Sequence, residues 1–360
     1  MAAAAHLTTF LKTLTTVAIG GVSGWVASRL GLPLAWMMGS MLTVGLIGMF
    51  GIKIGGHGVE VPHWLRTSMI PIIGVMLGSG FTPTVVAGIG EWWVTMLALI
   101  VFILLASAVA YQFYRRVFGF DAITSYFSSI PGGLIDMAII GEAAGGDGRS
   151  ISLVHFARIL VSVLTIPFLM QWLYGPIGHQ AIHPGASSLE IELVDVGLLT
   201  ACAVVGYFGG RAIRLPGAQI SGPLFLSAIA HGTQLTAASP PDFLIAVAQI
   251  VVGSSLGARF AGVSVRAAGK VMLASMCATA LMFAVTIALA LSLATFVDEP
   301  LPALILAYSP GGVAEMSLIA LSMNVGVAFV TAHHIARIAL SVGMMPQIWR
   351  RVVAPRVAAS

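Results

Sequence analysis

Two copies of a polar trio lie inside otherwise apolar stretches of this sequence. Each copy has a histidine, an arginine three residues later and a serine four residues after that: His155, Arg158 and Ser162, and His334, Arg337 and Ser341. A charge at the centre of a bilayer costs roughly 2.5–3.5 kcal/mol even on lenient scales, so each arginine needs compensation. Residues three and four apart share a helix face, which predicts that each trio points inward together.

Two acids are the natural partners of these arginines. Asp136 and Glu315 each follow a Pro-Gly-Gly sequence by a few residues, which predicts one acid–arginine pair in each copy. Such a pair handles solute or protons, or it only pins one segment to its neighbour, and the sequence leaves both interpretations open. If transport is coupled to protons, the acids and the two histidines of the trios are the groups that would carry them.

The Pro-Gly-Gly sequences predict breaks in two helices. Proline removes a hydrogen-bond donor and glycine permits turns, so a helix must stop and restart there. Broken backbone at membrane depth is tolerated where it lines a polar cavity, and the restarting helix aims free N–H groups at that place. A tight loop between two ordinary helices is the alternative. The candidate solute-binding residues are the two tips and their flanking hydroxyls, with both arginines close by: Ser128, Ser129, Pro131, Gly132, Gly133, Tyr308, Ser309, Pro310, Gly311, Gly312, Arg158 and Arg337.

The whole chain is an internal duplication. A shift of 179 residues places Pro131-Gly132-Gly133 on Pro310-Gly311-Gly312 and the first trio on the second. With small gaps the earlier segments align as well. We therefore divide the chain into a first repeat at 1–175, a polar linker at 176–193 and a second repeat at 194–360.

Composition predicts that these repeats lie in a membrane. Of the 360 residues, 8% are charged and 58% are hydrophobic, too few polar side chains to cover a soluble surface. Apolar segments near the length of roughly 20 residues needed for one crossing occur ten times. They lie at about 13–30, 33–51, 65–81, 91–114, 150–172, 194–213, 216–233, 243–259, 270–296 and 328–348.

Lysine and arginine placement predicts how the repeats are oriented. If the interrupted segments at about 121–145 and 300–322 were crossings, basic residues would divide almost evenly between the two sides of the membrane. If both segments instead dip in and return, every basic residue outside the trios except Arg29 falls on one side. We therefore predict an all-α polytopic protein with two inverted repeats. Each has five transmembrane helices and one re-entrant hairpin, the linker is periplasmic and both termini are cytoplasmic.

Other chemistries lack the residues they need. Cys202 and Cys277 lie apart in apolar runs, and His179, His183 and His333 have no companions at metal-ligand spacing. The sequence contains no phosphate-binding loop and no basic module for nucleic acid. We expect no cofactor, no metal and no enzymatic activity.

The repeated pattern Pro-Gly-Gly-x-x-acid-Met with His-x-Ala-Arg-Ile resembles the Gram-negative AbrB duplication family over nearly the whole chain. The resemblance implies a multi-pass protein of the bacterial inner membrane. Members of that family are labelled as ammonia monooxygenases or as regulators of gene expression, and neither label finds supporting residues here. The inverted hairpins are also similar in architecture to elevator-type carriers.

Three hypotheses follow. The first is a secondary transporter for a small, anionic organic solute, bound between the hairpin tips and coupled to H⁺ or Na⁺. The second is a membrane sensor or regulatory protein whose hairpins are structural, and the third is a subunit of a membrane monooxygenase. The partners expected are the lipid bilayer and the solute, and the oligomeric state is left open, a homodimer included.

Overall fold

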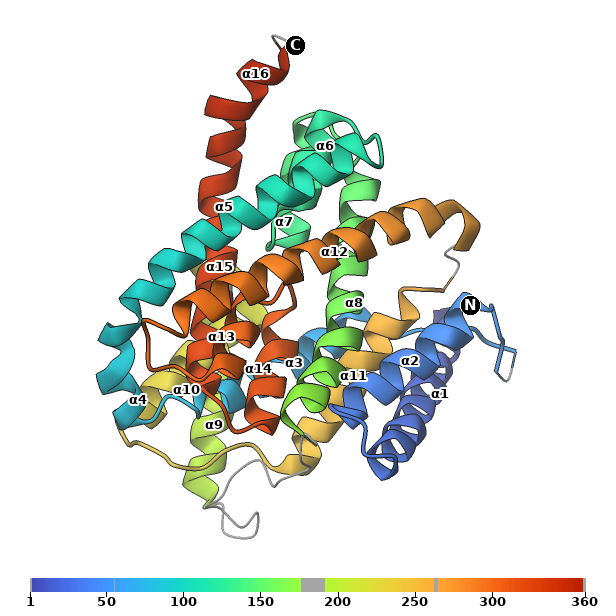
Figure 1. Ribbon diagram of the computed structural model, residues 1–360. Helices are drawn as coiled ribbons and strands as arrows, with labels where there is room; N and C mark the ends of the chain where they lie inside the picture. The colour runs from blue at the N-terminus through green and yellow to red at the C-terminus, as the bar shows by residue number, and fades with distance from the viewer. Residues whose placement is uncertain (1, 55, 176–191, 262–264, 359–360) are drawn as a thin grey trace. The chain divides into compact units, whose positions relative to one another are not determined.

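The computed structural model describes residues 2–54, 56–175, 192–261 and 265–358 as a set of helices (Figure 1). Apart from one bridge between Ile54 and His57, no strand pairing occurs in these ranges. The predicted all-helical fold is confirmed in these ranges. An apolar segment on its own forms a helix because a helix pairs its backbone N–H and C=O groups within the segment. Nearly all of the predicted linker, with its two histidines, lies outside the described residues.

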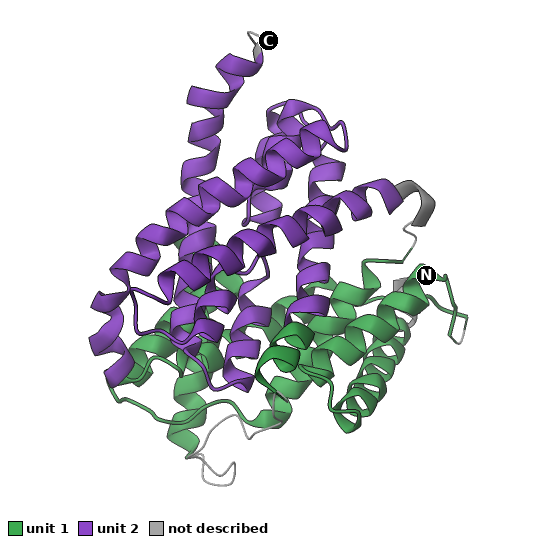
Figure 2. Ribbon diagram, viewed as in Figure 1, with its two compact units in different colours: residues 1–83, 167–268 green, residues 84–166, 269–360 purple. Residues whose placement is uncertain are grey.

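The chain forms two compact units, and each combines parts of both repeats (Figure 2). Unit 1 comprises residues 1–83 and 167–268, and unit 2 comprises residues 84–166 and 269–360. The helices of unit 1 are α1 (Ala2–Arg29), α2 (Ala35–Met49), α3 (His63–Gly78), α9 (Leu193–Ala212), α10 (Ala218–Gly232) and α11 (Asp242–Ala258).

Unit 2 contains both interrupted segments. Two helices, α8 (Gly148–Tyr174) and α12 (Val265–Leu293), contribute residues to both units. Helix α4 (Pro83–Gly88) starts at the last residue of the first segment of unit 1 and continues into unit 2. The other helices of unit 2 are the 3₁₀ turn Ile89–Trp92, α5 (Trp93–Arg116), α6 (Ala122–Ser129), α7 (Leu134–Ala143), α13 (Leu301–Tyr308), α14 (Val313–Ser322), α15 (Val327–Ile348), the π turn Trp349–Val353 and α16 (Ala354–Ala358).

Helix bounds repeat along the chain with the shift that aligns the sequence. Adding 179 to the bounds of α6 and α7 reproduces those of α13 and α14, and the same shift carries the first residues of α3 and α8 onto those of α11 and α15. Adding 183 to the bounds of α2 reproduces those of α10. The duplication is therefore present both in the amino-acid sequence and in the positions where helices start and end.

In unit 1 the helices of the two repeats exchange partners through glycines. The second helix of each repeat packs on the third helix of the other, α2 on α11 and α10 on α3. A Cβ on Gly78 would lie 2.6 Å from the carbonyl oxygen of Leu224, and one on its counterpart Gly257 would lie 2.5 Å from that of Met41. Small residues that let backbones approach are typical of helix pairs in membranes. The same contact therefore occurs in both directions between the repeats.

Among the described residues, six helical segments are long and apolar enough to cross a membrane, namely Thr9–Arg29, Pro83–Arg116, Gly148–Tyr174, Leu193–Ala212, Gly269–Leu293 and Val327–Val357. All ten predicted crossings coincide with helices, but α2, α3, α10 and α11 have only 15, 16, 15 and 17 residues. At about 1.5 Å per residue these four fall short of a hydrocarbon core of about 30 Å. The length and composition of the long helices are those of a multi-pass membrane protein.

The glycine contacts of unit 1 predict a stability difference between two Gly→Ala variants. Gly257→Ala should lower the melting temperature of the purified protein in detergent, by an amount equivalent to about 1–3 kcal/mol, because the new methyl group meets backbone atoms of α2. Gly209→Ala is the matched control, since a Cβ there meets nothing within 4 Å. An equal effect of both substitutions would contradict this packing.

Candidate functional site

Each interrupted segment folds back as a helical hairpin. The first hairpin is α6–α7 with the first tip at residues 130–133, and the second is α13–α14 with the second tip at residues 309–312. Proline disfavours helical backbone in the residue before it, and Ile130 and Ser309 are accordingly extended, with ψ of 125° and 140°. Each helix therefore ends two residues before its proline, and the predicted helix breaks are present.

The arginines of the long helices cap the ends of the first half-helices. Nη1 of Arg158 donates to the carbonyl oxygen of Ile130 over 2.7 Å. Nη1 of Arg337 donates in the same way to the carbonyl oxygen of Ser309, and its Nη2 donates to that of Gly311 over 2.6 Å. The last carbonyls of a helix lack partners and carry partial negative charge, so a buried cation is well placed there.

The histidines of the trios complete this network, and their contacts define their protonation. Nη2 of Arg158 donates to Nδ1 of His155 over 3.0 Å, and Nε2 of that ring lies 2.9 Å from the carbonyl oxygen of Phe127. A guanidinium only donates and a carbonyl only accepts, so the ring carries its proton on Nε2 and is neutral. His334 has the same two contacts, with Arg337 at 2.9 Å and with the carbonyl of Leu306 at 2.9 Å.

The serines of the trios connect each long helix to the other repeat. Oγ of Ser162 on α8 donates to the carbonyl oxygen of Pro310 in the second tip over 3.1 Å. Ser341 on α15 lies against the first tip, where a Cβ on Gly132 would be 3.1 Å from its Oγ. Because Arg158 contacts the first tip one helical turn before Ser162 contacts the second, the two tips lie together in unit 2.

The acids lie at the starts of the restarting helices. Asp136 and Glu315 occupy the first turns of α7 and α14, where the positive end of a helix dipole favours a carboxylate. Asp136 is exposed and makes no ion pair with a described residue, so the predicted pair with Arg158 does not form. Glu315 is buried, with its carboxylate beside Gly312. Arg158 finds its acceptors in the tip carbonyl of Ile130 and in His155 instead.

The predicted tip hydroxyls divide into bonded and unbonded groups. Oγ of Ser129 donates to the carbonyl of Tyr126 over 2.7 Å, and Oγ of Ser309 donates to that of Ile305 over 2.6 Å, so both serve their own helices. The hydroxyl of Tyr308 donates over 2.6 Å to the carbonyl of Thr95 on α5 and is not available at the tip. Only Ser128 Oγ, which is fully buried, lacks a partner among the described residues.

Four buried donors near the tips stay unbonded within the described part of the chain. They are Nε of both arginines and Oγ of Ser128 and of Ser341. The two arginine side chains are 5% and 3% exposed, and both serines are fully buried. The sequence placed Ser162 and Ser341 on the arginine face but assigned them no role, although their spacing of one turn from the arginines was the signal for it.

His333 is a core residue beside this network. Its Nδ1 lies 2.8 Å from the carbonyl oxygen of Phe329, and its ring centroid lies 4.0 Å from that of Phe329. The ring is fully buried. These contacts make His333 a structural residue of the core.

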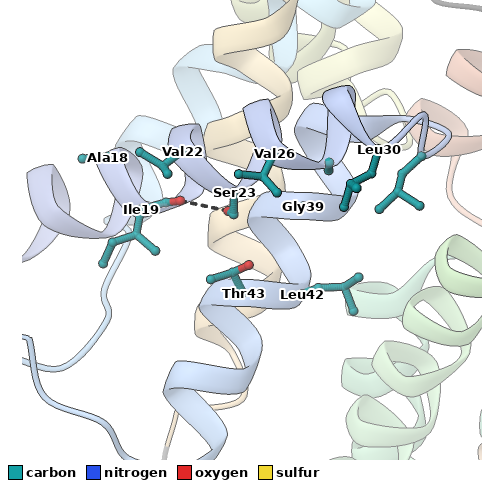
Figure 3. A pocket seen from close by; sticks show the side chains of 11 residues that line it. Ala18, Ile19, Val22, Ser23, Val26, Leu30, Gly39, Leu42 and Thr43 are labelled. Atoms are coloured by element: carbon teal, nitrogen blue, oxygen red, sulfur yellow. Dashed lines mark hydrogen bonds between the residues drawn. The ribbon is translucent and has the colours of Figure 1, made fainter.

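A groove in unit 1 offers a different kind of surface. It lies along α1 and α2, has a volume of about 580 Å³ and is lined mainly by aliphatic side chains such as Val22, Val26 and Leu42 (Figure 3). The hydroxyl of Ser23 in this groove is bonded to the carbonyl of Ile19 over 2.8 Å. With no charged lining residue, the groove is a poor site for a polar solute.

Comparisons with known proteins agree on one family. A family model described as transition state regulatory protein AbrB matches residues 36–353. A Bacillus subtilis (strain 168) protein named YhjN is 25% identical over 365 residues, which cover 94% of this chain and 93% of that protein. An Escherichia coli (strain K12) protein named "Putative regulator AbrB" is 23% identical over 307 residues, 85% of this chain and 86% of that protein.

The capping network predicts a large effect of removing one arginine. Arg337→Met leaves two tip carbonyls and Nδ1 of His334 without their donor, and each unsatisfied buried group costs about 1–3 kcal/mol. We expect a marked fall in the melting temperature of the purified protein. Arg350→Met, at an exposed arginine of the adjoining π turn, should change stability by less than about 0.5 kcal/mol. A stable Arg337→Met protein would show that the tip does not depend on this side chain.

Proposed function

This chain belongs to the family described as transition state regulatory protein AbrB and is a multi-pass helical membrane protein, and on that premise we propose that it is a secondary transporter. Its solute is a small, anionic organic molecule held between the two hairpin tips. The observation that carries the proposal is that two broken helices from opposite repeats present their tips side by side, one helical turn apart along α8. Discontinuous helices paired across repeats are the usual form of a carrier site.

The donors around the tips support an anionic solute. Nε of Arg158 and of Arg337 are charged donors inside the protein, and no described residue accepts from either of them. Arginine cannot accept a hydrogen bond, so a ligand at these atoms must bring an acceptor, and a negative charge strengthens the contact. Asp136 and Glu315 at the restarting helices offset part of the positive charge, which keeps the binding of a small anion reversible.

Coupling to H⁺ or Na⁺ falls to the acids in this proposal. The two histidines are neutral donors to carbonyls and acceptors from arginine, so protonating either ring breaks an arginine contact. Asp136 and Glu315 are carboxylates beside the tips, able to take a proton or to contribute to a sodium site. No cofactor and no enzymatic step is needed for this activity.

The membrane topology that we propose has ten crossings and two re-entrant hairpins in inverted repeats. The four short helices of unit 1 then cross with the six long ones, and both termini are cytoplasmic in the bacterial inner membrane. Support comes from the lysines and arginines outside the two trios, which all fall on one side of the membrane in this topology except Arg29.

An elevator-like mechanism fits the division into units. Both hairpins and both arginines belong to unit 2, whereas the glycine-packed pairs α2–α11 and α3–α10 belong to unit 1. A solute bound at the tips would therefore travel with unit 2 if that unit moves as a body, as in elevator carriers.

A sensor or regulatory protein is the second candidate. The name of the Escherichia coli relative includes the word regulator, and the arginines already cap two helices, a purely structural duty. A sensor would bind a solute at the same tips without moving it across the membrane.

Exchange of solutes by the full chain in proteoliposomes tests the transporter. Vesicles are loaded with a mixture of small organic acids, amino acids and amines, and mass spectrometry follows which compounds leave or enter. We expect exchange of at least one organic anion. The rate should fall about 10-fold or more in Arg158→Lys, because lysine keeps the charge but cannot bond to the carbonyl of Ile130 and to His155 in the planar geometry of a guanidinium. Folded protein that exchanges nothing above protein-free vesicles would contradict a carrier, and unchanged exchange in Arg158→Lys would remove this arginine from the mechanism.

A reporter inserted in the linker at residues 179–188 tests the inverted topology. We expect alkaline phosphatase fused there to be active and green fluorescent protein to be dark, because the proposed linker is periplasmic. The opposite pattern would indicate twelve crossings and parallel repeats.

A further inference from the structure

The duplicated contacts around the two tips are not equally complete. In the second tip, three successive carbonyls accept from side chains: Ser309 and Gly311 from Arg337, and Pro310 from Ser162. In the first tip, only the carbonyl of Ile130 accepts from a side chain of the described residues. The first tip therefore holds fewer bonds although its sequence motif is the same.

The backbone conformation of the two tips differs as well. Gly133 in the first tip adopts a left-handed conformation with φ of 61°, which glycine alone adopts readily. Its counterpart Gly312 is extended, with φ of −83° and ψ of 158°. One motif thus takes two shapes, and only the extended shape is accompanied by side-chain donors at all three carbonyls.

The donors that would serve the first tip are present but only partly used. Ser341 is the counterpart of Ser162 and lies against Gly132, yet its buried Oγ bonds to no described residue. Arg158 uses Nη1 and Nη2 as Arg337 does, but donates to one tip carbonyl instead of two. A buried donor without a partner is costly, so each such group calls for an explanation.

We propose that a carboxylate group of the solute binds at the first tip, accepting from the hydroxyl of Ser341 and from the guanidinium of Arg158, whereas the hydroxyl of Ser162 and the two Nη groups of Arg337 hold the second tip in place. This inference rests on the proposed function and assigns its ligand class. A guanidinium is donor-only and a serine hydroxyl can donate, so the pair matches the two acceptor oxygens and the negative charge of a carboxylate. A protonated amine offers neither.

Matched substitutions of the two serines separate the roles. Ser162→Ala removes a bond to the second tip, so the melting temperature of the unliganded protein should fall. Ser341→Ala removes a buried hydroxyl that bonds to no described residue, so the unliganded protein should be as stable as the parent or more so. Equal destabilisation by both would show that Ser341 holds the first tip and would overturn the inference.

The ligand test uses sodium acetate, succinate and citrate as probes, with sodium chloride and the neutral amides acetamide and succinamide as controls. We expect at least one carboxylate, and neither amide, to raise the melting temperature of the parent protein and of Ser162→Ala. In Ser341→Ala the apparent affinity for that carboxylate should fall about 10-fold or more, the loss of one hydrogen bond to a charged group. A carboxylate effect that persists unchanged in Ser341→Ala, or stabilisation by the amides alone, would overturn the inference.

Solute exchange separates this inference from the proposed function. Exchange of a solute without a carboxylate group would leave the transporter standing and end the assignment of Ser341. Carboxylate binding that depends on Ser341, without any exchange, would support the assigned site and favour a sensor over a transporter.

Discussion

Unit 2 depends on one constraint: a helix that breaks inside an apolar protein leaves carbonyl groups that must find donors. Water is scarce there, and the neighbouring helices have used their own backbone donors. Arg158 and Arg337 meet the need by donating to the ends of α6 and α13, and each is held in position by a neutral histidine. The broken helix thus compensates the buried charge, and the charge compensates the broken helix. This mutual dependence explains why proline, glycine, histidine and arginine occur together in both repeats.

Duplication lets the two breaks meet. Each long helix contacts the tip of its own repeat through arginine. Helix α8 also contacts the other tip through Ser162, one helical turn after Arg158, so both tips lie against the same part of α8. Unit 1 shows the same exchange between repeats, with Gly78 and Gly257 at close contacts. The compact units therefore follow equivalent parts of the repeats and not the repeats themselves. That division places every candidate binding residue in unit 2.

Much of this arrangement could be predicted from sequence. Apolar runs marked all ten long segments, and the Pro-Gly-Gly motifs marked both hairpins, because hydropathy and helix breakers act locally. The partner of Arg158 was predicted wrongly as Asp136, since every residue has a carbonyl and no pattern marks which one an arginine will reach. The different backbone conformations of Gly133 and Gly312 could not be predicted either, because glycine in the same motif permits both. Grouping into units was missed because it depends on contacts between repeats, which a linear division into copies does not contain.

The central claim is that the two tips enclose one shared polar site, and cross-linking tests it most directly. Cys202 and Cys277 are first replaced by serine, and Pro131→Cys and Pro310→Cys are then combined in one variant. This variant is treated in membranes with a short bifunctional methanethiosulfonate, which links two nearby cysteines. The account predicts a cross-link within one chain, slowed by a solute that the protein exchanges or binds. Failure of the two cysteines to cross-link while each reacts singly, or a rate unaffected by that solute, would contradict a shared site.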